Sequence, residues 1–122
     1  MDWYNGFSPA QRARAGRWIS REVKAGRLSW SSSCMICGRT DGRFQLHAED
    51  YSEPFGPQTS QFGVCVRCHQ QIHRRFTDPA RYTVYADMVS RSAVSGADPT
   101  LLLRIEAGEF VPDNPRPRIS EP

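Results

Sequence analysis

A chain of 122 residues is long enough for one small domain, and its hydrophobic content of 39% predicts a thin core. No apolar run approaches membrane-spanning length, and the segment from Met1 to Trp18 is polar and Arg-rich where a signal segment would be hydrophobic. We therefore expect a cytoplasmic protein without membrane contact. The net charge is +3, and every basic residue except Lys24 is an arginine. Arginine forks suit phosphate groups, but a coding bias toward arginine explains the excess equally well.

The first predicted element is a helix over residues 8–26. Ser8 and Gln11 form a capping box, Pro9 suits the first helical position, and Gly26 is a typical stop. An apolar stripe at helical spacing predicts the buried face, and it consists of Ala15, Trp18, Ile19 and Val23. Arg17 and Arg21 lie on the remaining surface. They are candidates for nucleic-acid contact, or members of an ordinary solvated face.

The middle of the chain predicts two short strands, at residues 43–47 and 62–64, joined by a long loop. A helix follows over residues 65–76. Asp78-Pro79 and Asp98-Pro99 each predict the start of a further helix, and the first of these should bury Tyr82, Tyr85, Met88 and Val89. We therefore expect a single α+β domain over residues 1–111. Its core motif is at 34–76, and helical segments at 8–26 and 78–107 flank that motif. An extended Pro-rich tail follows at 112–122.

The cysteines form two Cys-x-x-Cys pairs, which are Cys34 with Cys37 and Cys65 with Cys68. Each pair can form a tight turn, and two such turns complete a tetrahedron of thiolates around zinc. In a reducing compartment, paired cysteines are more often metal ligands than disulfides. The spacing therefore predicts a structural zinc site.

Other interpretations of the cysteines remain open. They could be ordinary buried cysteines or redox pairs, although a redox Cys-x-x-Cys site usually needs only one pair. The run from Cys65 to His69 also matches a c-type haem attachment motif. Haem attachment requires export, and it leaves the pair at Cys34 and Cys37 without a role.

The three histidines predict a second metal site. His69 and His73 are four residues apart and share one face of the expected helix, and His47 ends the preceding strand. Three imidazoles leave a coordination position open for water or a phosphate oxygen, which suits a catalytic ion such as Mg²⁺, Mn²⁺, Ni²⁺ or Zn²⁺. Alternatively, His69 or His73 replaces a cysteine around a single zinc, or the histidines are ordinary surface residues.

The middle of the chain carries a set of motifs made up of the paired cysteines, Phe44-x-Leu46-His47, Tyr51, Pro54 and Cys68-His69-x-x-x-His73. Together they resemble the zinc-stapled branch of the HNH endonucleases. The resemblance covers residues 34–76. It implies a ββα-metal fold in which His47, His69 and His73 bind the catalytic-type ion and the cysteines bind a separate zinc. It also implies metal-dependent hydrolysis of nucleic-acid phosphodiester bonds, with DNA as the expected substrate. Arg74 and Arg75, directly after His73, are candidate phosphate contacts.

The chain departs from the family pattern at two positions. Ala48 stands where the family has the general-base histidine, and Ser60 stands where it has a loop-orienting asparagine. Glu49 and Asp50 are candidate substitute bases or ordinary loop acids, and His47 is a further candidate base if the metal site is different or empty. Because general-base catalysis contributes about two to four powers of ten to the rate, these departures favour an alternative. In that alternative the chain is a non-catalytic, zinc-stabilised module that binds nucleic acid or a protein.

Overall fold

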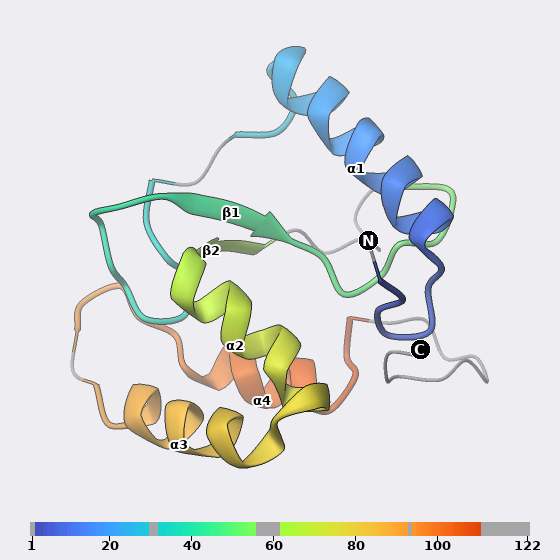
Figure 1. Ribbon diagram of the computed structural model, residues 1–122. Helices are drawn as coiled ribbons and strands as arrows, with labels where there is room; N and C mark the ends of the chain where they lie inside the picture. Colours follow the sequence, from blue (N-terminus) through green and yellow to red (C-terminus); the bar gives the residue numbers. More distant parts are fainter. Residues whose placement is uncertain (1, 30–31, 56–61, 93, 111–122) are drawn as a thin grey trace. The chain divides into compact units, whose positions relative to one another are not determined.

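The chain forms two compact units in the computed structural model, which describes residues 2–29, 32–55, 62–92 and 94–110 (Figure 1). The first unit combines Met1–Ser29, Ala48–Gln61 and Phe110–Pro122, and the second combines Trp30–His47 and Phe62–Glu109. The single domain over 1–111 stays a prediction. The predicted tail at 112–122 lies outside the described residues.

The first unit contains helix α1, Pro9–Lys24. The capping box is present in full, because the Ser8 side chain accepts from the Gln11 backbone N–H and the Gln11 side chain accepts from the Ser8 backbone. Gly26 follows the helix with a φ of 78°, a conformation that favours glycine. The predicted helix is therefore confirmed, with Ala15 fully buried on its apolar side.

A tight turn precedes α1. Tyr4 and Phe7 exchange two backbone hydrogen bonds around Asn5-Gly6, and both central residues have positive φ. Asn-Gly is the usual sequence for such a turn. The rings of Tyr4 and Phe7 pack edge-on against Tyr51, with centroids 6.2 and 5.5 Å apart.

The second unit is built on a two-stranded antiparallel sheet of β1, Phe44–His47, and β2, Phe62–Cys65. Phe44 pairs with Cys65 and His47 pairs with Phe62, so the last residue of β1 lies opposite the first residue of β2. Helix α2, Val66–Thr77, continues directly from β2 (Figure 1). Both strands and this helix were predicted within a residue or two.

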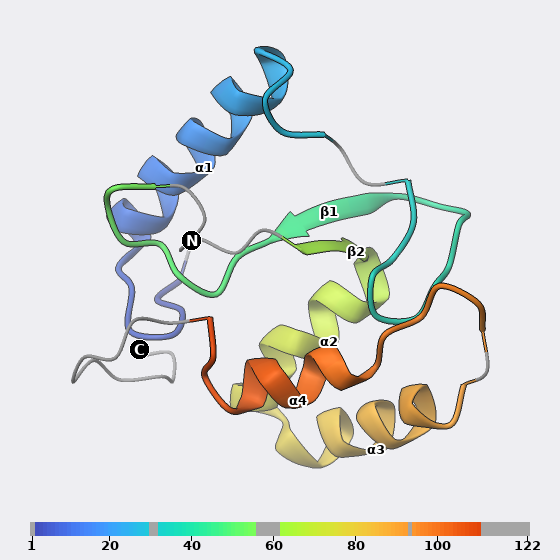
Figure 2. The same cartoon turned by 180° about the vertical axis from the view of Figure 1, so that it is seen from behind.

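Two further helices complete the second unit, α3 at Pro79–Ser90 and α4 at Thr100–Glu106; Figure 2 shows them from behind. α2 packs mainly on α3. The described residues therefore form a small α+β arrangement of four helices and one two-stranded sheet. The core of this unit contains Ile36, Val64, Ile72, Tyr82, Tyr85, Val89, Leu101, Leu102 and Ile105.

One sequence prediction about these helices was wrong. Met88 is 46% exposed and outside the core, because its neighbour Val89 takes the buried position and the Met88 sulfur lies beside the Arg67 guanidinium at the surface. α4 begins after Asp98-Pro99 as predicted, although without a side-chain cap: the Asp98 carboxylate accepts from the Thr100 hydroxyl, and its backbone carbonyl accepts from Leu101 N–H. No helix in the described part of the chain has the length and apolar character that a membrane span needs.

Candidate metal centres

Each Cys-x-x-Cys pair forms a turn closed by an N–H···S contact. The Cys34 sulfur accepts from the Cys37 backbone N–H at 3.5 Å, and the Cys65 sulfur accepts from the Cys68 backbone N–H at 3.4 Å. Cys65 is also the N-cap residue of α2. The second pair is therefore fixed by the strand-to-helix junction, where β2 becomes α2.

The first pair is held against the same strand. Met35 N–H donates to the Gly63 carbonyl of β2 at 2.9 Å. Gly38 follows the pair with a φ of 79°, and a Cβ there would lie 2.9 Å from a Val94 methyl group and 3.0 Å from the Ser95 carbonyl oxygen. Glycine is therefore required at position 38 both by the backbone conformation and by the close approach of the segment before α4.

The four sulfur atoms form one cluster, and all lie within 4.8 Å of one another. The Cys37 and Cys65 sulfurs are 3.8 Å apart. A disulfide would place them at about 2.05 Å. Four thiolates around zinc, each about 2.3 Å from the ion at the corners of a tetrahedron, lie about 3.8 Å from one another. The four cysteines could thus hold a metal such as zinc.

Protonation within the cluster is uneven when no metal is bound. A hydrogen bond from Cys68 lowers the pKa of the Cys34 thiol, whereas the same bond and then burial raise the pKa of Cys68. Burial also raises the pKa of Cys37. A metal must therefore displace protons from Cys37 and Cys68 when it binds.

The three histidines form a second cluster in the same unit. The rings of His47, His69 and His73 lie at centroid distances of 4.8 to 5.2 Å, and each ring offers one nitrogen within 4.8 Å of the others. The Nε2 atoms of His69 and His73 are 3.1 Å apart. Two imidazole nitrogens on one tetrahedral zinc lie about 3.3–3.4 Å apart, so the donor set fits a divalent ion. His47 is buried, and the two helix histidines are half-buried.

Gln45 orients one of these imidazoles. Its side-chain oxygen lies 2.6 Å from His69 Nδ1. An amide oxygen only accepts, so His69 Nδ1 carries the hydrogen and Nε2 keeps the lone pair that a metal needs. Gln45 was not predicted as a site residue, although the sequence carries a signal for it. It lies two residues before His47 on β1, and alternate residues of a strand share a face.

The predicted arginines differ in their surroundings. Arg74 lines an open hollow of about 310 Å³ together with His69, Gln70 and His73. Arg75 instead donates to the Ile72 carbonyl at 2.8 Å and stacks on Phe76. Both contacts are within the last turns of α2, so they stabilise the end of that helix. Arg17 and Arg21 are exposed on α1.

The candidate substitute bases make their own contacts in the first unit. Glu49 is buried, and its carboxylate accepts from the Tyr4 hydroxyl and, at 3.4 Å, from the Asn5 amide. Asp50 is also buried and accepts from the Ser52 backbone and hydroxyl at 2.9 and 2.6 Å. Ala48 is buried as well, and Ser60 lies outside the described residues. Nothing in the sequence signalled Tyr4 or Asn5 as partners of Glu49.

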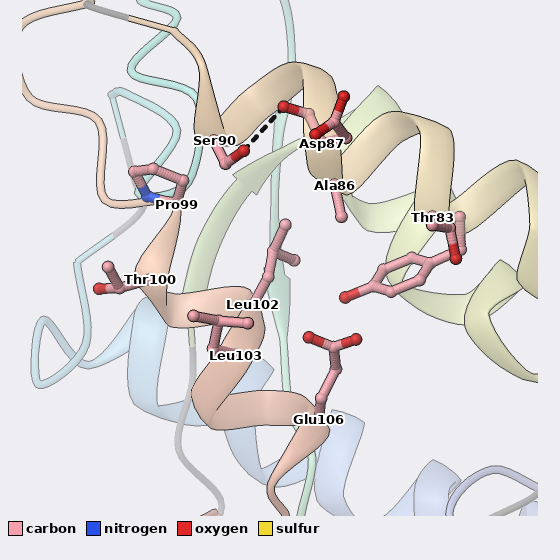
Figure 3. A pocket seen from close by; sticks show the side chains of 10 residues that line it. Thr83, Ala86, Asp87, Ser90, Pro99, Thr100, Leu102, Leu103 and Glu106 are labelled. Carbon is pink, nitrogen blue, oxygen red and sulfur yellow. Dashed lines mark hydrogen bonds between the residues drawn. The ribbon is translucent and has the colours of Figure 1, made fainter.

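A further concavity of about 380 Å³ lies between α3 and α4 (Figure 3). Leu102 of α4 points toward Ala86 of α3 (Figure 3), and Leu103, Asp87 and Glu106 also line the pocket. Its described lining contains no cysteine or histidine. This pocket is therefore separate from both metal-ligand clusters.

The chain matches no family model, no curated protein and no solved structure.

Proposed function

We propose that the protein is an HNH-like, metal-dependent nuclease. The single observation that carries this proposal is the convergence of His47 from the end of β1 with His69 and His73 from one face of α2. Three neutral imidazoles with an open fourth position are a donor set typical of catalytic metals. The strand, returning strand and helix that supply them are the elements that the ββα-metal resemblance implies.

The four-cysteine cluster would hold a structural zinc in the same account. Its ligands come from the turn before β1 and from the junction of β2 with α2, so zinc would fix the start of the helix that carries His69 and His73. Position errors of about 1 Å in a catalytic group can cost two powers of ten in rate. The zinc would therefore serve catalysis indirectly, by holding the helix in register with β1.

A divalent ion at the histidine cluster would supply Lewis-acid chemistry toward a phosphodiester. The chain's own residues do the remaining work. Gln45 holds His69 in the tautomer in which Nε2 carries the lone pair. Arg74, at the edge of the open hollow, would hold a phosphate adjoining the scissile bond. DNA is the proposed substrate.

A specific observation favours a second candidate, a non-catalytic zinc-stabilised module on the same fold. Ala48 carries no proton acceptor, and the carboxylates of Glu49 and Asp50 are buried and hydrogen-bonded within the first unit. A buried carboxylate that already accepts hydrogen bonds is a poor general base. His47 could act as base only if it is not a metal ligand, so the proposed nuclease would activate water without a side-chain base.

Plasmid nicking tests the proposal. Purified protein is incubated with supercoiled DNA and Mg²⁺, Mn²⁺, Ni²⁺ or Zn²⁺, and wild type is compared with His73→Ala and with Thr77→Ala. Thr77 lies one turn beyond His73 on the same helix and supplies no ligand. We expect nicking by wild type and Thr77→Ala, and at least a hundredfold loss in His73→Ala. If no metal supports nicking, the non-catalytic candidate replaces the nuclease; equal nicking by His73→Ala rejects the assigned site.

A further inference from the structure

One face of α1 carries only small and basic side chains. At about 100° per residue, this face covers roughly a third of the helix circumference, on the side away from the buried Ala15. Its exposed residues are Ala10, Arg14, Arg17, Ser20, Arg21 and Lys24. The acid of this helix, Glu22, lies outside the face and bonds to Arg27 at 2.6 Å. The face is therefore uniformly positive.

Three of these cations have no ion-pair partner among the described residues. Arg14 bonds to Glu53 at 3.1 Å, whereas Arg17, Arg21 and Lys24 make no such contact in that part of the chain. The three lie within about 60° of one another around the helix and span about 10.5 Å along its axis. Their charges are thus available to an external anion along a narrow line.

The side chains between these cations are small, so the surface there is shallow and hollow. Ala13, Gly16 and Ser20 line a shallow hollow that Arg12, Arg17 and Arg21 border. A Cβ placed on Gly16 would meet nothing within 4 Å, so none of the described residues covers the helix there. Small side chains let a partner's backbone approach the helix while the longer basic side chains reach around it.

We infer that this face of α1 binds the phosphate backbone of duplex DNA, an inference that rests on the proposed nuclease for its choice of nucleic acid. Duplex DNA carries one negative charge per about 1.7 Å of axis, so a line of three cations about 10.5 Å long meets several phosphates. Single-stranded partners are usually held by aromatic side chains that stack on bases, and this face has none.

The side-chain chemistry of this face fits phosphates. Arginine and lysine only donate hydrogen bonds, and ionised phosphate oxygens accept them. Ser20, the other exposed polar side chain on this face, can also donate. The face therefore gives a contact that does not depend on base sequence.

The salt dependence of binding tests the inference. Each phosphate contact to duplex DNA contributes about 0.9 to the slope of log affinity against log salt concentration, against about 0.7 for a single strand. Binding of a 20-base-pair duplex is measured between 50 and 200 mM salt in a His73→Ala background, which removes cleavage. Removing Arg17, Arg21 and Lys24 together by alanine substitution should reduce the slope by about 2.7.

A matched control removes the same charge from paired arginines. Arg27, Arg91 and Arg104 bond to Glu22, Asp87 and Glu109, and their triple alanine variant should lower the slope by less than about one. Both triple variants are first shown to keep the wild-type zinc content and melting temperature. Single-stranded DNA and duplex RNA of equal length form the other arms, and both should bind more weakly than the DNA duplex at 150 mM salt.

Several results overturn the inference: no duplex binding by the parent protein, an equal change of slope in both triple variants, or tighter binding of either competing nucleic acid. If the protein does not nick DNA but the triple variant still lowers the salt slope by about 2.7, the α1 surface is supported and only the nuclease proposal fails. If the protein nicks DNA but the salt slope of the triple variant is unchanged, the nuclease proposal is supported and the α1 surface is rejected.

Discussion

Replacing Cys34 by serine should unfold the second unit. Without zinc, the turn at Cys34 is joined to the rest of the unit by the buried Ile36 side chain and by a few backbone hydrogen bonds, such as Met35 N–H to Gly63 and Asp98 N–H to Met35. Each contributes about 1 kcal/mol, whereas ordering the chain from Cys37 to Cys65 costs about 3 kcal/mol in loop closure alone. Structural zinc in small domains contributes about 10–16 kcal/mol of apparent binding energy. This is as large as the whole stability of a typical domain, about 5–15 kcal/mol.

Cys34→Ser should therefore lower the melting temperature by at least about 15 °C, or abolish the cooperative transition. Circular dichroism during heating measures this, and elemental analysis of the same samples measures zinc. Ser32→Ala is the control, since Ser32 is exposed and lies just before the cluster. A Cys34→Ser protein that melts with wild type would refute the structural zinc, as would one that keeps a full equivalent of zinc.

Three further predictions concern the neighbouring groups. Gln45→Leu should weaken binding of the second metal by about ten- to a hundredfold without changing zinc at the cysteines, as measured by titration calorimetry; unchanged affinity would mean that Gln45 does not orient His69. Zinc affinity of the cysteine cluster should fall as pH decreases, because the raised pKa values of Cys37 and Cys68 keep protons there that zinc must displace; competition with a chromophoric chelator from pH 8 to 6 should show about a tenfold loss per pH unit for each proton released, and a flat profile would contradict this. Glu49→Gln should lower the free energy of unfolding, measured in urea, by about 1–3 kcal/mol, because the Tyr4 hydroxyl loses a charged acceptor. The nicking rate should stay within about threefold of wild type. A stable variant with abolished nicking would instead identify Glu49 as the base.

The elements were predictable where local chemistry determines them. Ser8, Pro9 and Gln11 set the start of α1 through backbone contacts within one turn, so no tertiary information was needed. The cysteine spacing likewise indicated both turns. Met88 was misplaced because helical spacing alone cannot tell which of two adjacent apolar residues, Met88 or Val89, will meet the neighbouring helix.

The contacts around the site were harder to predict from the sequence. The partners of Glu49 are Tyr4 and Asn5, more than forty residues away, and the Asn5-Gly6 turn that positions them is a local feature with no visible link to the loop. Gln45 was within reach through strand alternation. Whether Glu49 is a base or a buried structural acid depends on long-range packing, which sequence spacing does not encode.

The central claim is that His47, His69 and His73 bind a metal separate from the cysteine site. Metal content per chain tests it most directly, measured after loading with Zn²⁺ or Mn²⁺ and removal of weakly bound ions. We expect two ions in wild type and in Thr77→Ala, and one zinc in His73→Ala. One ion in every protein would contradict the histidine site, as would two ions retained by His73→Ala.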